Sequence, residues 1–228
     1  MVSSLKLRKS VRGFTLIELM VALTIMAVST GLLLANYPNS IIKLTLLNNT
    51  HSSALLVREA QIRGSAIDSA STTVGGYGVF VDKTYPSKAI LFSDNVEGVD
   101  VTNNAGFHIG DGLYNVTVSP DVVKDTLQFK EGYYFKKLCV ASSTAAEYLL
   151  NPQPFLCNTV NGTAINTITV SFNRPSQVAH IYINGNNSND FTSACLQLYS
   201  PKSPEVGHVR ALQILHSGVI TTKVTSCD

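Results

Sequence analysis

Glu18 is the residue whose type and position most clearly require a chemical partner. From Leu19 to Ala35 the chain carries no charge, and the apolar run counted from Phe14 covers about 22 residues, or roughly 33 Å of helix, enough to cross a bilayer core. A charge in a lipid-facing helix costs on the order of 2.5–3.5 kcal/mol. We therefore expect Glu18 to meet a designated group of opposite charge.

Four cysteines form the second set of residues that could do chemistry: Cys139, Cys157, Cys195 and Cys227. They show no C-x-x-C spacing and no neighbouring histidines, which disfavours zinc binding or redox catalysis. Structural disulfides in an oxidising exterior explain them better, and four cysteines allow three pairings. Joining neighbours along the chain, Cys139 to Cys157 and Cys195 to Cys227, would close loops worth roughly 3–4 kcal/mol each in the chain-entropy picture.

The remaining candidates for chemistry are sparse. The five histidines are scattered, and the sequence contains neither a Gly-x-Ser-x-Gly elbow nor a phosphate loop. Asp94, Glu97 and Asp100 could hold calcium through oxygen ligands, but their spacing differs from that of an EF-hand and an ordinary polar loop is favoured. We predict that the chain is not an enzyme and needs no cofactor.

The segment before the apolar run explains the position of Glu18. Residues 1–13 carry four basic residues and no acid: Lys6, Arg8, Lys9 and Arg12. Followed by Gly13-Phe-Thr-Leu-Ile-Glu18, this leader resembles the class III signal of type IV prepilins and pseudopilins. The resemblance implies that a membrane-embedded prepilin peptidase cleaves between Gly13 and Phe14 and methylates the new amine. Glu18 would become the fifth residue of the product.

The order of leader and apolar run also predicts the location of the protein. A secretory signal places its cleavage site after the apolar core, whereas here the site precedes it and the apolar segment stays on the mature chain. The basic leader keeps the N-terminus cytoplasmic. We expect a single-pass inner-membrane protein whose residues after about Ala35 face outward, before it joins a pilus or pseudopilus.

The resemblance also implies an assembly role and a set of partners. As a filament grows, Glu18 would pair with the α-ammonium of Phe14 on the neighbouring subunit. Leaving one member of a buried ion pair unmatched costs about 3–5 kcal/mol, so this pairing would set the axial register of each incoming subunit. The implied partners are the prepilin peptidase, other pilin or pseudopilin subunits, the inner-membrane assembly platform and membrane lipid.

Net charge gives no support to nucleic-acid binding. The chain has 17 basic and 15 acidic residues, and removing the four basic residues of the leader leaves 13 basic residues against 15 acidic ones. The basic character therefore belongs mostly to the signal and not to a general polyanion-binding surface.

The sequence segments that contain these residues predict an α+β, pilin-like fold. A long N-terminal helix, transmembrane in its first half, would pack on an antiparallel sheet. We divide the chain into a leader (1–13), a transmembrane and filament-core helix (14–36), an amphipathic second half of the helix (37–70) and an exported β-rich domain (71–228). Pro38 predicts a kink or brief break.

The second half of the helix has an apolar arc and one internal ion pair. Glu59 and Arg63 are four residues apart in the favourable order and can pair. The predicted core-facing arc is Leu55, Leu56, Ala60, Ile62, Ala66 and Ile67.

The rest of the chain is predicted to form short β-strands. Alternation and turn residues predict strands at 75–81, 89–92, 107–118, 126–129, 133–140, 165–172, 178–183, 210–215 and 219–224, with a stapled loop at 141–162. The helix segment 54–64 and the closing hairpin are similar to GspH/FimT-type minor pseudopilins. Some FimT-type pilins bind DNA through an arginine-rich motif in that hairpin, but here its tip, 217–223, holds no arginine.

These observations predict a structural role. The chain would be a minor pseudopilin or pilin-like subunit of a type II secretion system or a type IV pilus. The alternative is a minor pilin that binds DNA or a surface at a pilus tip, and a membrane-anchored exported enzyme is a third possibility. An arginine patch on the folded sheet would favour DNA binding, whereas a flat sheet with an apolar edge would favour a subunit interface.

Overall fold

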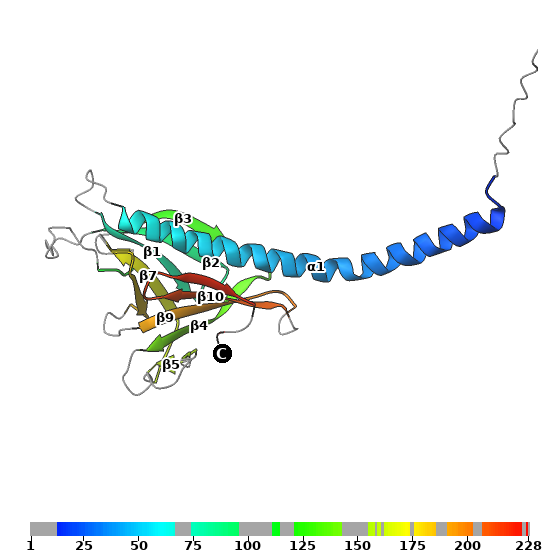
Figure 1. Ribbon diagram of the computed structural model, residues 1–228. Helices are drawn as coiled ribbons and strands as arrows, with labels where there is room; N and C mark the ends of the chain where they lie inside the picture. Colours follow the sequence, from blue (N-terminus) through cyan, green and yellow to red (C-terminus); the bar gives the residue numbers. More distant parts are fainter. Residues whose placement is uncertain are drawn as a thin grey trace, which may run out of the picture. The chain divides into compact units, whose positions relative to one another are not determined.

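A computed structural model describes residues 13–66, 74–95, 111–114, 121–142, 155–157, 159–160, 162–173, 176–185, 191–202, 207–224 and 227. The chain divides into two units, Met1–Ile41 and Ile42–Asp228. One helix, α1, extends from Leu16 to Ser65 and contributes to both units. The β-strands all belong to the second unit (Figure 1).

The first half of α1 is long and apolar enough to cross a membrane by length and composition. Its hydroxyl groups are compatible with that environment because each donates to a backbone carbonyl in the preceding turn: Thr24 to Val21, Ser29 to Ile25 and Thr30 to Met26, at 2.6–2.8 Å. A hydroxyl satisfied within its own helix leaves no exposed donor for lipid to solvate. The N-terminal helix therefore supports membrane anchoring.

The predicted break at Pro38 does not occur, because α1 is helical on both sides of this residue and through it. Proline removes one backbone donor and crowds the preceding turn. It does not end the helix here because helix-forming sequence continues for more than one turn on either side. The proposed kink stays a prediction.

The face of α1 that enters the core differs from the predicted arc. Leu55 and Ile62 are 67% and 63% exposed, so that part of the prediction is wrong. Leu56 and Ala60 of the predicted arc are buried, as expected. The other buried positions of α1 continue the same face at a spacing of three and four residues, and several are small or polar: Leu46, Thr50, Ser53, Val57 and Gly64.

Small side chains allow the helix to approach the sheet closely. A Cβ atom at Gly64 would collide with the backbone carbonyl oxygen of Phe172. The polar members of this face are satisfied locally, because Thr50 donates to the Leu46 carbonyl at 2.7 Å and Ser53 donates to the Asn49 carbonyl at 2.8 Å. The predicted pair of Glu59 and Arg63 is confirmed.

Two antiparallel sheets complete the second unit (Figure 1). The five-stranded sheet has the order β3-β2-β1-β7-β8, with β1 Val74–Asp82, β2 Lys88–Asn95, β3 Val122–Gln128, β7 Thr167–Asn173 and β8 Ala179–Ile183. The four-stranded sheet has the order β11-β10-β9-β4, with β4 Tyr134–Ser142, β9 Phe191–Tyr199, β10 Val209–Leu215 and β11 Ile220–Lys223. A small hairpin pairs β5 Thr159–Val160 with β6 Thr163–Ala164.

One hydrophobic cluster joins α1 to the inner faces of both large sheets. Leu46 and Val57 of α1 belong to the same cluster as Val170 of β7 and Leu196 of β9. Successive residues of a strand point to opposite faces, so the opposite faces of both sheets are left for other contacts. The predicted α+β fold, with an apolar N-terminal helix packed on antiparallel sheets, is confirmed.

Eight of the predicted strands are present with shifted ends: β1, β2, β3, β4, β7, β8, β10 and β11. Of the predicted strand 107–118, only 111–114 is described, and those residues are not a strand. The sequence reading missed β9, whose side chains are nearly all buried. A strand covered on both faces lacks the alternation by which strands are recognised.

Candidate processing and assembly site

The residues just before α1 form a helix cap. The backbone N–H of Glu18 donates to the Thr15 hydroxyl at 3.3 Å, and the N–H of Leu19 donates to the Thr15 carbonyl at 3.1 Å. Thr15 is therefore the N-cap residue and Glu18 is the third helical residue, which is the spacing of a capping box. The sequence reading missed Thr15, although Thr-x-x-Glu before an apolar run signals such a cap.

The predicted cleavage site lies immediately outside the helix. Gly13 and Phe14 have no regular secondary structure, and the Phe14 side chain is 83% exposed. A Cβ atom at Gly13 would meet no atom of the described chain within 4 Å. Packing within this chain therefore does not require glycine at position 13, and the bond after it is accessible to a peptidase.

The electrostatics of the first turn favour an acid at position 18. Unpaired N–H groups give a helix N-terminus a partial positive charge, and an acid in the first turn offsets it by about 0.3–1 kcal/mol. Cleavage after Gly13 would place the α-ammonium of Phe14 at this same end. Within the described residues Glu18 makes no ion pair, so its carboxylate can meet a cation from outside the chain.

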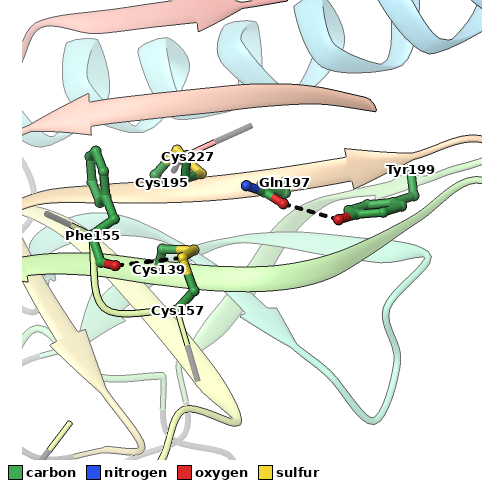
Figure 2. Close-up of a disulfide and its surroundings, with 7 residues drawn as sticks. All are labelled: Cys139, Phe155, Cys157, Cys195, Gln197, Tyr199 and Cys227. Atoms are coloured by element: carbon green, nitrogen blue, oxygen red, sulfur yellow. Dashed lines mark hydrogen bonds between the residues drawn. A yellow bond between two sulfur atoms is a disulfide. The ribbon is translucent and has the colours of Figure 1, made fainter. Parts of the chain in front are cut away.

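The four cysteines meet on the outer face of the four-stranded sheet (Figure 2). Cys139 of β4 and Cys195 of β9 are directly opposite in the strand register. They are nevertheless bonded to Cys157 and Cys227, respectively. The structure thus pairs neighbours along the chain.

Each disulfide fastens a segment outside the large sheets to this face. Phe155 and Cys157 pack in the same cluster as Cys139 and Cys195. Between them, Leu156 exchanges two backbone hydrogen bonds with Val140, at 2.8 and 3.0 Å. The two crosslinks tie one segment from the middle of the domain and one from its C-terminal end to the same pair of strands.

Of the three candidate calcium ligands, Asp94 alone lies in the part of the chain that the structure describes. Asp94 is buried, and its carboxylate accepts the Gly112 N–H at 2.7 Å, while Glu97 and Asp100 lie outside the described residues. Burial, together with the nearby carboxylates of Asp94 and Asp111, raises the pKa of the Tyr182 hydroxyl. Within the described ranges, no three acidic, histidine or cysteine side chains gather as metal ligands do.

Two histidines lie where the sheets meet. The rings of His180 in β8 and His216 after β10 are 6.2 Å apart and nearly perpendicular. His216 Nδ1 lies 2.9 Å from the Ala179 carbonyl oxygen, and the Ala179 N–H donates to the His216 carbonyl at 2.9 Å. Burial and then the charge of His216 lower the pKa of His180. The arrangement joins two sheets and carries no metal-binding set.

Comparison with known proteins concerns the processing and assembly site at residues 13–18. Residues 8–34 match the family described as the prokaryotic N-terminal methylation motif, a range that contains Gly13, Phe14, Thr15 and Glu18. No curated protein and no solved structure matches the chain. The motif implies processing by a prepilin peptidase and assembly with other pilins. It therefore supports a type IV pilin-like protein, a structural subunit anchored in the membrane through its N-terminal helix.

Proposed function

We propose that this chain is a minor pseudopilin or pilin-like subunit of a type II secretion system or a type IV pilus. The methylation motif over residues 8–34 carries the proposal. An accessible Gly13–Phe14 bond, a capped helix start and an apolar segment long enough to cross a membrane support it.

Processing would create the charge that assembly uses. Hydrolysis of the bond between Gly13 and Phe14 releases the basic leader and leaves an α-amine on Phe14. A methylated amine is still protonated near neutral pH, so the new N-terminus is a cation. It would lie beside the positive end of its own helix, which is an unfavourable position that a carboxylate from another subunit can relieve.

Glu18 would supply that carboxylate on a neighbouring subunit. Thr15 fixes the first turn, so the Glu18 side chain leaves the helix from a defined position. In a low-dielectric bundle of helices the pair is not necessarily more stable than two apolar groups, but an unmatched member costs about 3–5 kcal/mol. The pair would therefore select one axial offset between subunits.

A comparison of Glu18→Leu with Glu18→Asp tests this proposal in cells that make the filament. Glu18→Leu should leave cleavage intact and favour residence in the membrane, because it removes a carboxylate that lipid solvates poorly. The variant should nevertheless be depleted from sheared filaments. Glu18→Asp keeps the charge and should retain part of the assembly.

The two fractions to compare are sheared filaments and membranes, with intact mass confirming cleavage in each. Normal entry of Glu18→Leu into filaments would refute the pairing. If that result came with salt-sensitive DNA binding by the full-length protein, the tip-binding alternative would replace the structural one.

A further inference from the structure

Three turns of the second unit gather at the end where α1 enters it. The Tyr133 hydroxyl, in the turn between β3 and β4, donates to the Ile42 carbonyl at 3.2 Å. The turn between β1 and β2 is bound to the same region, because Phe129 N–H donates to the Ser87 carbonyl at 2.8 Å and Phe135 N–H donates to the Pro86 carbonyl at 2.7 Å.

The connection from β9 to β10 reaches the same place. A Cβ atom at Gly207 would lie 3.3 Å from Lys43 Cε, and a Cβ atom at Gly132 would lie 2.6 Å from Pro201. These contacts place two of the three turns against residues 42 and 43 of α1, and the turn between β1 and β2 is joined to the residues that flank the turn between β3 and β4.

This end of the domain is rich in lysine. The cluster, which we call the lysine-rich end, consists of Lys43, Lys83, Lys88, Lys130, Lys136 and Lys202. Lys43, Lys88, Lys130 and Lys136 are exposed. The acids described on the same turns are Asp82 and Glu131, so positive charge predominates although the mature chain is slightly acidic as a whole.

Tyrosine rings accompany the lysines. Lys88 Nζ lies 5.8 Å from the centre of the Tyr85 ring, and Lys136 Nζ lies 5.2 Å from that of Tyr199. Tyr85 is 62% exposed. Tyrosine and lysine together are typical of surfaces at a membrane–water interface, where an amphipathic ring and a long basic side chain both reach the headgroups.

The chain itself keeps this end near a membrane. Only six residues lie between Ala35, the last of the apolar run, and Ile42, so the two are about 10 Å apart along the helix. The headgroup layer on each side of a bilayer core is about 5–8 Å thick. The first residues of the domain are therefore within reach of the headgroups.

We propose that the lysine-rich end binds the anionic headgroups of the membrane in which α1 is anchored. Phosphatidylglycerol has the required chemistry, a single negative phosphate at the bilayer surface, and juxtamembrane basic clusters are attracted to such lipids. Membrane attachment is preferred to nucleic acid because the exposed basic residues of this end are lysines, whereas arginine is the side chain best suited to bidentate phosphate contacts, and Arg210 at the start of β10 is only partly exposed. This inference rests on the membrane anchoring in the proposed function and not on filament assembly.

A tryptophan reporter tests the proposal, because the chain has no tryptophan of its own. Full-length Tyr85→Trp protein would be reconstituted into phosphatidylcholine vesicles with or without phosphatidylglycerol, each containing some lipid with a nitroxide on its headgroup. Val219→Trp is the control, because Val219 lies far from the lysine-rich end. The carbonyl of its neighbour Gly218 accepts a hydrogen bond from the Gln61 side chain, and Gln61 is about 28 Å from Ile42 along α1.

We expect the Tyr85→Trp fluorescence to be quenched about twofold more when phosphatidylglycerol is present, since lysines near an anionic surface are attracted to it. The difference in quenching between the two vesicle types should disappear as the salt concentration is raised from about 0.1 M to about 1 M, because the Debye length shrinks from about 10 Å to about 3 Å. The Val219→Trp signal should not depend on the anionic lipid.

Two matched charge removals complete the test in the Tyr85→Trp background. Lys130→Gln with Lys136→Gln should abolish the lipid-dependent quenching, whereas Lys124→Gln with Arg58→Gln removes the same charge elsewhere and should preserve it. Equal quenching in both vesicle types, or equal effects of the two variants, would overturn the proposal. The proposal would also be overturned if the protein bound a DNA duplex through Lys130 and Lys136 while the anionic lipid had no effect. Vesicle flotation reports anchoring separately: protein that fails to float argues against the proposed function itself.

Discussion

Packing within the described chain places no demand on the side chain at position 13. Gly13 lies outside α1, and a side chain there would meet nothing in the described chain. We propose that the processing peptidase is the molecule that requires glycine at this position.

Gly13→Arg should consequently block cleavage without unfolding the chain. The intact mass of membrane-extracted protein should be that of the full precursor, whereas the wild type should start at Phe14. Gly13→Ala is the matched control, since a methyl group is the smallest side chain that tests the space in the peptidase. A wild-type mature chain that still begins at Met1 would contradict the pilin-like processing.

The site residues differ in how well the sequence alone could reveal them. Glu18 stands out because a charge inside an apolar run has an energetic cost that calls for an explanation. Gly13 and Phe14 stand out only through the resemblance of the leader and the following residues to the prepilin signal. Thr15 was missed because threonine has no such cost and its role depends on where the helix starts. The structure supplies that start, and the Thr15 hydroxyl then accounts for an otherwise unpaired N–H of the first turn.

At the scale of elements, α1 shows why hydrophobicity alone gave only part of the core face: Leu56 and Ala60 are buried as predicted, whereas Leu55 and Ile62 are exposed. Leu46, Leu56 and Val57 enter the core, but near Gly64 the sheet comes so close to the helix that small residues occupy the contact, while Leu55 and Ile62 remain outside. A sequence pattern records which residues are apolar but not how near the next layer lies. Strand β9 was not predicted because both of its faces are covered, and its sequence therefore lacks the alternation of apolar and polar residues. Its neighbours β4 and β10 were predicted.

The close contact at Gly64 yields a prediction about stability. Gly64→Ala should destabilise the folded domain by about 1–3 kcal/mol, since the new methyl group meets the Phe172 backbone. This loss would outweigh the roughly 1 kcal/mol by which alanine favours a helix over glycine. Urea unfolding followed by circular dichroism measures the difference.

Gly31→Ala is the control for that experiment, because it makes the same replacement in the same helix where a Cβ atom meets nothing within 4 Å. It should leave the unfolding midpoint of the domain unchanged. A Gly64→Ala protein as stable as Gly31→Ala would show that the sheet can move away from α1 at little cost.

At the scale of the whole molecule, covalent and titratable groups connect parts that are distant in the chain. The disulfide of Cys195 spans 32 residues and that of Cys139 spans 18. His180 and His216 join the two sheets without a covalent bond. The stability of the domain should therefore depend on both oxidation and pH.

Peptide mapping without reduction should recover Cys139 joined to Cys157 and Cys195 joined to Cys227, with no alkylatable thiol. Losing one such crosslink typically costs 2–5 kcal/mol in a small exported domain. The informative alternative is a peptide joining Cys139 to Cys195, which are opposite each other in the sheet. Its recovery from native protein would contradict the pairing described above.

The histidine pair predicts that the domain weakens in mild acid. Burial holds the pKa of His180 below its ordinary value of 6.5, so below that pH the unfolded chain binds a proton that the folded chain resists. Stability should thus be full above about pH 6.5 and fall as the pH drops, levelling off below the folded pKa. Thermal unfolding of His180→Gln should lack this decline, and an identical decline in the variant would assign it to other groups.

The strand order has a consequence for the making of the protein. β1 pairs with β7, which begins about 85 residues after β1 ends, and synthesis at about 5–20 residues per second separates them by roughly 4–17 s. During that interval a glycine-rich hairpin edge has no partner beyond β2, and α1 has no sheet to cover its small-residue face. A membrane-tethered nascent domain in this state would be exposed to proteases and to pairing with other unfinished chains. A holding factor at the site of export would be most valuable in the seconds before β7 emerges.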